Sequence, residues 1–306
     1  MYNGEDVIFT RFDILYDVVD RFYVTEGATS FSGNRKERLF KDVNAESFAP
    51  YQDKIRWVIY DEAEDTWETG GGEEQDAKID AIERSGKVTS ELIDLKEESR
   101  KLKSFRKEER IRSFVLTVLE GDLEKRTLVE PFVVIMADVD EIPDPNVVRE
   151  FQPGGLWHSA AIGKEATGLV MDSFYYNFNW KMRKTWLRAY ILPGNLAISG
   201  EKASYDTSIR DFPKTILNAG WHCSFFSSLS KIKYKIESFS HTELDKDLYK
   251  SNEHILDCIT NGKDLFMRKD ALLSPHDYMH LPLPLQKFHE RVVKKQNTTR
   301  LRMIGF

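Results

Sequence analysis

Three acidic residues follow an apolar run in the middle of the chain, and two of them, Asp138 and Asp140, could bind a metal ion. Residues 132–137 carry no charge, as expected of a strand buried on both faces, and Asp138, Asp140 and Glu141 come next. Acids at the carboxyl end of a buried strand stand where open α/β sheets bind ligands. The spacing of Asp138 and Asp140 lets both carboxylates reach one Mn²⁺ or Mg²⁺, with substrate phosphates as further ligands. The pattern predicts a site for a leaving nucleotide diphosphate; the alternative is a strand end with solvated acids.

The elements needed to position these acids begin at the N-terminus. Apolar residues at Val7, Ile8, Phe12 and Leu15 have helical spacing. Residues 22–26 and 54–60 are short aromatic and β-branched runs, which predict strands, and Glu26 ends the first as Asp138 ends the later one. A helix, a strand, a loop and a strand in this order favour an α/β class with a nucleotide-binding half.

Charged residues dominate the stretch from Glu73 to Arg112, with apolar residues at helical intervals. The pattern predicts one or two exposed amphipathic helices and then a better-packed helix over 104–119. Such a charge run is typical of a solvated face. Glu109 and Arg112 are neighbours on one helix face, either as a surface pair or as support for the nucleotide site.

Length and composition indicate a folded globular chain. Its 306 residues can bury a large core, and 41% of them are hydrophobic and 12% aromatic. The net charge of −6 gives no global positive field, so we expect no nucleic-acid partner. No stretch reaches the roughly 18 apolar residues of a membrane helix, and Glu5, Asp6 and Arg11 interrupt any signal peptide at the N-terminus. Cys223 and Cys258 are expected to be free, buried thiols.

Several chemistries lack their sequence signals. His222 and His241 are isolated histidines, which are more often structural than metal-binding, and no zinc-ligand spacing occurs. There is no serine-hydrolase elbow, Walker loop or dinucleotide-binding turn. The aromatic residues of 169–180 could line an acceptor cleft, but a core role is favoured, since aromatic side chains dominate cores.

Short motifs along nearly the whole chain carry a family resemblance. They are Asn3–Arg11, Val18–Glu26, Thr29–Lys36, Glu109–Arg112, Asp138–Pro143, Phe174–Asn177, Ala219–Ser224 and Lys235–Glu243. In the order and spacing of these motifs the chain resembles glycosyltransferase family 17, the group containing the enzyme that adds the bisecting N-acetylglucosamine (GlcNAc) to N-glycans. We expect one domain over 1–306, in which residues 73–103 form a helical insertion that is longer than the family pattern needs.

The resemblance implies a GT-A-like nucleotide-sugar-binding fold with a central, mostly parallel sheet. It implies a metal-dependent, inverting transfer from a UDP-sugar, with UDP-GlcNAc expected, to an oligosaccharide or glycoprotein acceptor. The N-terminal anchor and stem of the animal enzymes are absent from this sequence. We therefore expect a soluble, cytoplasmic protein in this form, and the Golgi lumen only if an anchor was removed.

The resemblance also implies roles for single residues. Asp140 and Asp138 would bind Mn²⁺ or Mg²⁺, with His241 as a further ligand. Nucleotide and diphosphate contacts would come from Arg11, Lys36, Arg112 and Asp138, and Glu26 would act as base or contact the ribose. The base that inversion requires stays open among Glu141, His222, Asp211, Asp172 and Asp206; the first three are preferred.

Two other functions fit part of the pattern. One is a non-catalytic carbohydrate-binding protein of the same fold, against which the intact Asp138-Val139-Asp140 and His241 argue. The other is a metal-dependent nucleotidyltransferase, which would also place paired acids at a strand end. It would release pyrophosphate from a nucleoside triphosphate, so the product separates it from a sugar transferase.

Overall fold

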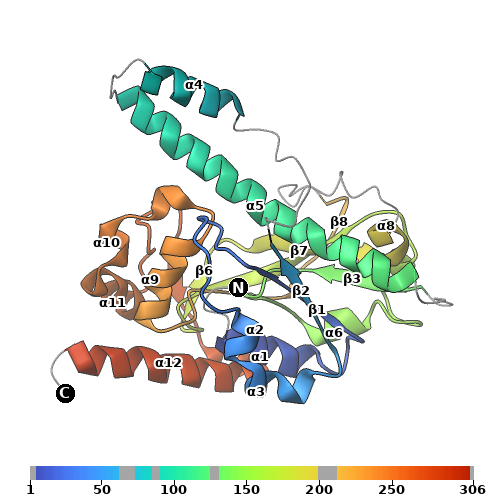
Figure 1. Cartoon of the computed structure of the whole chain (residues 1–306). Coiled ribbons are helices and arrows are strands. Elements are labelled where there is room, and N and C mark those ends of the chain that lie inside the picture. Colours follow the sequence, from blue (N-terminus) through green and yellow to red (C-terminus); the bar gives the residue numbers. More distant parts are fainter. Residues whose placement is uncertain (1–4, 62–72, 85–89, 125–130, 199–211, 304–306) are drawn as a thin grey trace.

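The computed structural model describes residues 5–61, 73–84, 90–124, 131–198 and 212–303, and it has a mixed α/β architecture (Figure 1). Strands β1 (Phe22–Gly27) and β2 (Ile55–Tyr60) form a small parallel pair, as the two N-terminal apolar runs predicted. The other strands form one curled sheet. Its members are β3 (Val133–Met136), β4 (Glu141–Pro143), β5 (Thr167–Tyr175), β6 (Trp180–Met182), β7 (Trp186–Pro193), β8 (Lys214–Ile216), β9 (Gly220–Ser224) and β10 (Leu273–Pro275).

The expected α/β class is confirmed, but the expected mostly parallel sheet is not what these strands form. Strand β5 pairs antiparallel with β6 and β7, and β3–β7, β4–β9 and β6–β10 are antiparallel too. Only β8 and β9 run parallel to β5 among the strands that the structure describes. The reason lies in the connections: β5, β6 and β7 follow one another through short turns, whereas parallel neighbours need crossovers of a dozen or more residues.

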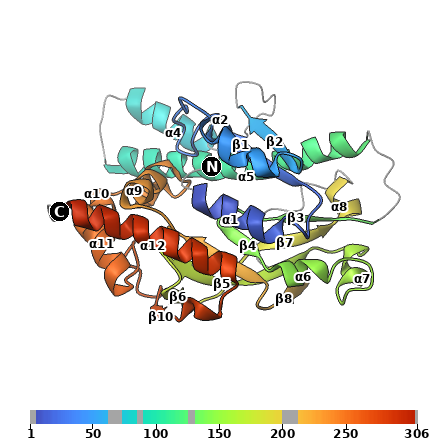
Figure 2. The same cartoon turned by 90° about the horizontal axis from the view of Figure 1, so that it is seen from below.

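Two terminal helices pack together along one side of the molecule (Figure 2). Helix α1 (Glu5–Leu15) buries Val7, Ile8, Phe12 and Leu15, the residues whose spacing predicted a helix. They share a core with residues of α12 (Leu283–Met303), of the sheet and of the turn between β5 and β6, namely Leu285, Phe288, Val292, Ile142, Phe174 and Phe178. The aromatic run after β5 is therefore core rather than an open cleft, because Phe174, Tyr176 and Phe178 have no exposed surface.

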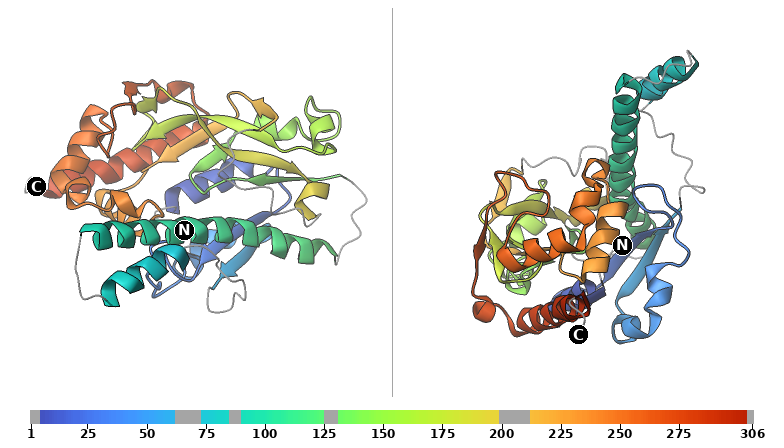
Figure 3. Two further views of the ribbon diagram at one scale, coloured as in Figure 1. Left: turned by 90° about the horizontal axis from the view of Figure 1, so that it is seen from above. Right: turned by 90° about the vertical axis from the view of Figure 1, so that its left-hand side faces the viewer.

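The charged stretch forms a helical hairpin of α4 (Glu73–Arg84) and α5 (Ser90–Glu124), whose far end projects from the rest of the chain (Figure 3, right). The helix expected over 104–119 lies within α5 and buries Ile111, Leu116 and Leu119. The segment 73–103, expected as a helical insertion, corresponds to α4 and the first part of α5. None of the helices that the structure describes, α5 included, is both long and apolar enough to cross a membrane.

Shorter helices complete the fold. They are α2 (Phe40–Val43), α3 (Ala45–Phe48), α6 (Pro145–Arg149), α7 (His158–Ala161), α8 (Gly194–Ile198), α9 (Leu229–Ser238), α10 (Asp247–Lys250) and α11 (Asn252–Asn261). Helices α9 and α11 pack with the turns after β5 and β9 through a second core that includes Cys258. Cys258 and Cys223 are both free and buried, as predicted.

Candidate functional site

The turn between β3 and β4 carries the acids that the sequence singled out. Among the described strands, β3 pairs with β7 alone, and its residues are half-buried. It is therefore an edge strand of the described sheet and not the fully buried strand we expected. The Glu141 N–H donates to the Asp138 carbonyl oxygen at 3.1 Å, which closes the turn. Asp138 and Asp140 therefore stand on one tight turn at the carboxyl end of β3.

Two arginines from different helices bind Asp138. Arg112 of α5 donates to both carboxylate oxygens, Nε to Oδ1 at 3.0 Å and Nη2 to Oδ2 at 2.5 Å. Arg11 of α1 donates to the Asp138 carbonyl oxygen at 2.5 Å. Burial lowers the pKa of Arg112, but Asp138, Glu108 and Glu109 outweigh it, so the pKa lies well above the ordinary value. The predicted pair of Glu109 and Arg112 thus exists, at 3.1 Å, and it backs the acidic turn.

Asp140 has a cationic partner that sequence reasoning missed. Lys235 of α9 donates to Asp140 Oδ2 at 2.9 Å and lies 5.0 Å from the Phe225 ring centroid. Burial opposes ionisation of Asp140, yet Lys235 and His222 bring its pKa down to about 2. Lys235 belongs to one of the motifs of the family resemblance, but nothing local to α9 links it to a turn 95 residues earlier.

Glu141 is buried behind the turn. One oxygen accepts the Trp186 indole N–H at 2.5 Å and the other accepts the Asp138 backbone N–H at 2.7 Å. Burial, together with the nearby charge of Asp138, raises the pKa of Glu141 to about 8 despite these hydrogen bonds. Both contacts suit Glu141 to holding the turn in shape. After Lys235, Trp186 at the start of β7 is a second residue of the site that no sequence pattern had indicated.

His222 also lies behind the turn, next to Trp186. Its ring stacks on Trp186 with centroids 4.0 Å apart and an angle of 6° between the planes. Its two nitrogens lie 3.1 Å from Ser173 Oγ and 3.2 Å from Ser224 Oγ. Burial lowers the pKa of His222 to about 4, so the ring is neutral at neutral pH. Glu141 and His222 face each other across the β4–β9 register, which brings two predicted site residues together.

Glu26 and Lys36 form a separate buried pair at the end of β1. Lys36 Nζ lies 3.1 Å from Glu26 Oε1, and the Glu26 carboxylate also accepts the backbone N–H groups of Phe40 at 2.7 Å and Lys41 at 3.3 Å. The Glu26 side chain has no exposed surface. These contacts attach the start of α2 to β1.

The His241 side chain has partners other than the two aspartates. It is half-exposed, its Nδ1 lies 3.0 Å from Glu243 Oε1, and its ring meets Phe105 edge-on at 4.9 Å. Phe105 and Arg112 are two turns apart on α5, about 10 Å along its axis. Over the described ranges, no three acidic, histidine or cysteine side chains are placed to hold a metal ion. The role of His241 as a ligand stays a prediction.

The remaining candidates for the base are scattered. Asp172 of β5 pairs with Lys181 at 2.7 Å. Asp206 and Asp211 lie outside the described residues.

The acidic turn is thus contacted by cationic side chains from three helices, namely Arg11, Arg112 and Lys235. The sequence model of glycosyltransferase family 17 matches residues 73–283. The chain belongs to glycosyltransferase family 17, so the protein is a glycosyltransferase that uses a sugar donor and a glycan acceptor. No curated protein and no solved structure matches the chain. The match begins at α4 and includes the helical hairpin, while the motifs before residue 73 lie outside it.

Proposed function

We propose that the protein transfers GlcNAc from UDP-GlcNAc to a hydroxyl of an oligosaccharide or glycoprotein, with inversion to a β-linkage in a GT-A-like site. One observation carries the proposal: Asp138 and Asp140 share one turn, and Arg11, Arg112 and Lys235 reach that turn from three different helices. Such a cluster offers both the acids for a hard cation and the fixed positive charge for a diphosphate.

The donor set fits Mn²⁺ or Mg²⁺ as a site that the substrate completes. Asp138 and Asp140 supply two carboxylates, and these cations usually bind one or two carboxylates together with substrate phosphates. When bound, the cation would neutralise charge on the leaving diphosphate. Both carboxylates now have cationic side-chain partners, which a metal ion would have to displace.

The basic side chains supply the second part of the mechanism. As the bond from the sugar to the diphosphate breaks, negative charge grows on the diphosphate oxygens, and preorganised cations stabilise that charge. Arg112 presents a planar fork, which suits bidentate binding of phosphate. Lys235 and Arg112 exchange their carboxylate contacts for phosphate contacts without leaving the site.

We propose that Glu141 and Trp186, behind the turn, are positioning residues. Glu141 ties the Asp138 backbone N–H to the Trp186 indole, so the turn has one shape before the donor arrives. An inverting transfer also needs a base on the face opposite the leaving group. Glu141, His222, Asp211, Asp172 and Asp206 stay predictions for that base. Glu26 and Lys36 stay predictions for the nucleotide, and His241 for the metal.

Isothermal titration calorimetry tests the binding part of the proposal. UDP-GlcNAc should bind with Mn²⁺ present and at least tenfold more weakly after excess chelator, and Asp138→Asn should behave as the wild type does in chelator. Asp270→Asn is the matched control, because it removes the charge of another ion-paired acid, an exposed one outside the turn that pairs with Lys184 at 2.7 Å. Equal affinity with metal and with chelator would contradict the metal role.

The products separate the proposed transferase from the other functions. With UDP-GlcNAc and a glycan acceptor we expect release of UDP. Pyrophosphate released from a nucleoside triphosphate would indicate nucleotidyl transfer, and glycan binding with no release of UDP would indicate a binding protein.

A further inference from the structure

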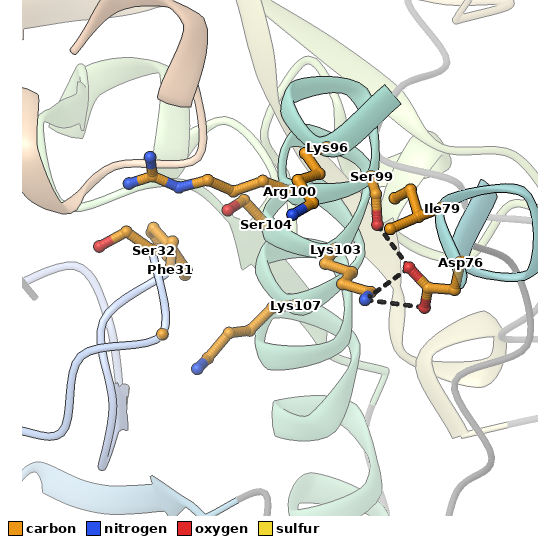
Figure 4. Close-up of a pocket in the computed structure, with 11 residues that line it drawn as sticks. Phe31, Ser32, Asp76, Ile79, Lys96, Ser99, Arg100, Lys103, Ser104 and Lys107 are labelled. Atoms are coloured by element: carbon orange, nitrogen blue, oxygen red, sulfur yellow. Dashed lines mark hydrogen bonds and ion pairs between the residues drawn. The ribbon is translucent and has the colours of Figure 1, made fainter. Parts of the chain in front are cut away.

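A second polar site lies on the α5 face that looks toward the loop after β1 (Figure 4). It is an open cavity of about 420 Å³, within the roughly 300–1,000 Å³ range of small-molecule pockets. Lys96, Arg100, Lys103 and Lys107 line it from α5, and their spacing of three or four residues places them on one helix face. The opposite wall includes Phe31, Ser32 and Gly33.

The charge of this pocket is unbalanced toward positive. Among the lining residues that the structure describes, Asp76 of α4 is the one acid, and it already binds Lys103 Nζ at 2.8 Å and Ser99 Oγ at 2.8 Å. Lys96 pairs with Glu83 at 2.6 Å. Arg100 has no hydrogen-bond or ion-pair partner within the described ranges, and its guanidinium extends toward the side of the pocket where Ser32 lies (Figure 4). An exposed guanidinium beside hydroxyl groups is suited to bind a carboxylate or phosphate group.

Both walls of the pocket connect to the acidic turn. The Lys107 ammonium donates to Thr29 Oγ1, and Arg112, which holds Asp138, follows about 7.5 Å further along the helix axis. On the other side, Ser32 Oγ donates to the Glu237 carbonyl oxygen at 3.0 Å, on the helix that supplies Lys235 to Asp140. The pocket therefore lies beside the proposed donor site, and a bound molecule could extend from one to the other.

We propose that this pocket binds the acceptor, and that the acceptor is an anionic saccharide carrying carboxylate or phosphate groups. This inference rests on the proposed function. The diphosphate of the donor has its own cations at the turn, and an uncharged nucleobase gains little from the Arg100 guanidinium. The substrate left to neutralise Arg100 is the acceptor, and Arg100 binds its anionic group directly. Lys96 and Lys103 keep their carboxylate partners Glu83 and Asp76.

Calorimetry with a defined saccharide tests the proposal. The probe is a tetrasaccharide of alternating glucuronate and GlcNAc, with a methyl-esterified version as the neutral control. We expect the anionic tetrasaccharide to bind at least tenfold more tightly than the ester, and more weakly as salt is added. Arg100→Gln should weaken its binding about tenfold, since a charge-assisted hydrogen bond is lost. A phosphorylated tetrasaccharide in a second titration shows which anion is preferred.

Two controls keep this test separate from the donor site. Arg183→Gln makes the same charge change at an exposed position outside the pocket, and it should leave saccharide binding unchanged. UDP-GlcNAc affinity should be the same in Arg100→Gln and in wild type. Equal binding of the anionic and esterified saccharides, or an Arg100→Gln variant that loses UDP-GlcNAc instead, would overturn the proposal. Failure of UDP-GlcNAc to bind wild type would contradict the proposed function alone.

Discussion

Strands β1 and β3 both end in an acid, but the two acids have opposite surroundings. At the end of β1, Glu26 is fully buried, and two of its partners are backbone N–H groups of the segment that begins α2. At the end of β3, the Asp138 side chain is 38% exposed, and its carboxylate partner is the side chain of Arg112. Asp140 likewise has Lys235. A main-chain partner cannot leave without local unfolding, whereas a side-chain cation can turn to a ligand.

Burial and the type of hydrogen-bond partner therefore distinguish a structural acid from a functional one at a strand end. A buried carboxylate that accepts main-chain hydrogen bonds joins two elements, so removing its charge should act on stability. A carboxylate whose partners are side-chain cations can be part of a site for a charged substrate, and removing its charge should act on turnover. The predictions below test this division, beginning with the largest expected effect.

Asp140→Asn should abolish transfer while the fold is kept. The amide preserves the size of the side chain but loses the charge that would bind the cation at the diphosphate. Electrostatic contacts to a developing charge are worth several kcal/mol, so we expect a loss on the order of a thousandfold in kcat. Single-turnover release of UDP measures it, and a thermal melt checks the fold. A rate within about threefold of wild type, roughly 0.6 kcal/mol of barrier, would rule out the assignment.

Glu26→Gln should show the reverse pattern, a loss of stability with little change in turnover. The substitution leaves the Lys36 ammonium without its carboxylate in a buried site and weakens the acceptor for two backbone N–H groups. Breaking a buried ion pair from one side costs about 3–5 kcal/mol. Urea unfolding should therefore show a fall of about 3 kcal/mol in the free energy of unfolding. If stability were kept and UDP affinity lost, Glu26 would be the nucleotide contact that the family resemblance implied.

The sequence predicted local structure better than long-range contacts. The helical spacing of Val7, Ile8, Phe12 and Leu15 identified α1, and the two N-terminal apolar runs identified β1 and β2. These patterns depend on neighbouring residues, and so they can be read directly. The prediction of a mostly parallel sheet was wrong. Strand direction depends on which strands pair with β5, and no local sequence pattern determines those partners.

The same limit applies to the site. The acids of the turn were predictable because they adjoin their strand in sequence. Arg11 was expected only through the family resemblance, whereas the helix spacing of Arg112 and Glu109 had already suggested support for the nucleotide site. Lys235 and Trp186 reach the turn from 95 and 45 residues away, and nothing in their own segments distinguishes them. Glu26 and Asp138 looked alike in sequence because burial, which separates them, is decided by the packing of α2 and α5.

The pH dependence of stability at His222 tests whether water reaches the residues behind the end of β3. Burial lowers the pKa of the folded-state imidazole from 6.5 to about 4. Its contribution to stability is complete above pH 6.5, falls as the pH drops because the unfolded chain takes the proton first, and levels off below pH 4. The wild-type curve also contains Glu141, whose folded-state pKa near 8 has the opposite effect, since the folded chain then holds the proton more tightly.

The variant His222→Gln isolates the histidine, because the wild-type and variant curves share the other titrating groups. The difference in free energy of unfolding between them should shrink by about 3 kcal/mol as the pH falls from 7 to 4, following roughly 1.4 kcal/mol for each unit of pKa shift. Urea unfolding at several pH values measures it. His280→Gln, a change at an exposed histidine, is the control and should alter stability by less than about 0.5 kcal/mol throughout. A difference between wild type and His222→Gln that does not change with pH would mean that water reaches the ring. The residues that support Asp140 from behind would then be as accessible to water as the turn itself. The proposed contrast between a buried support and an accessible pair of acids would be wrong at this site.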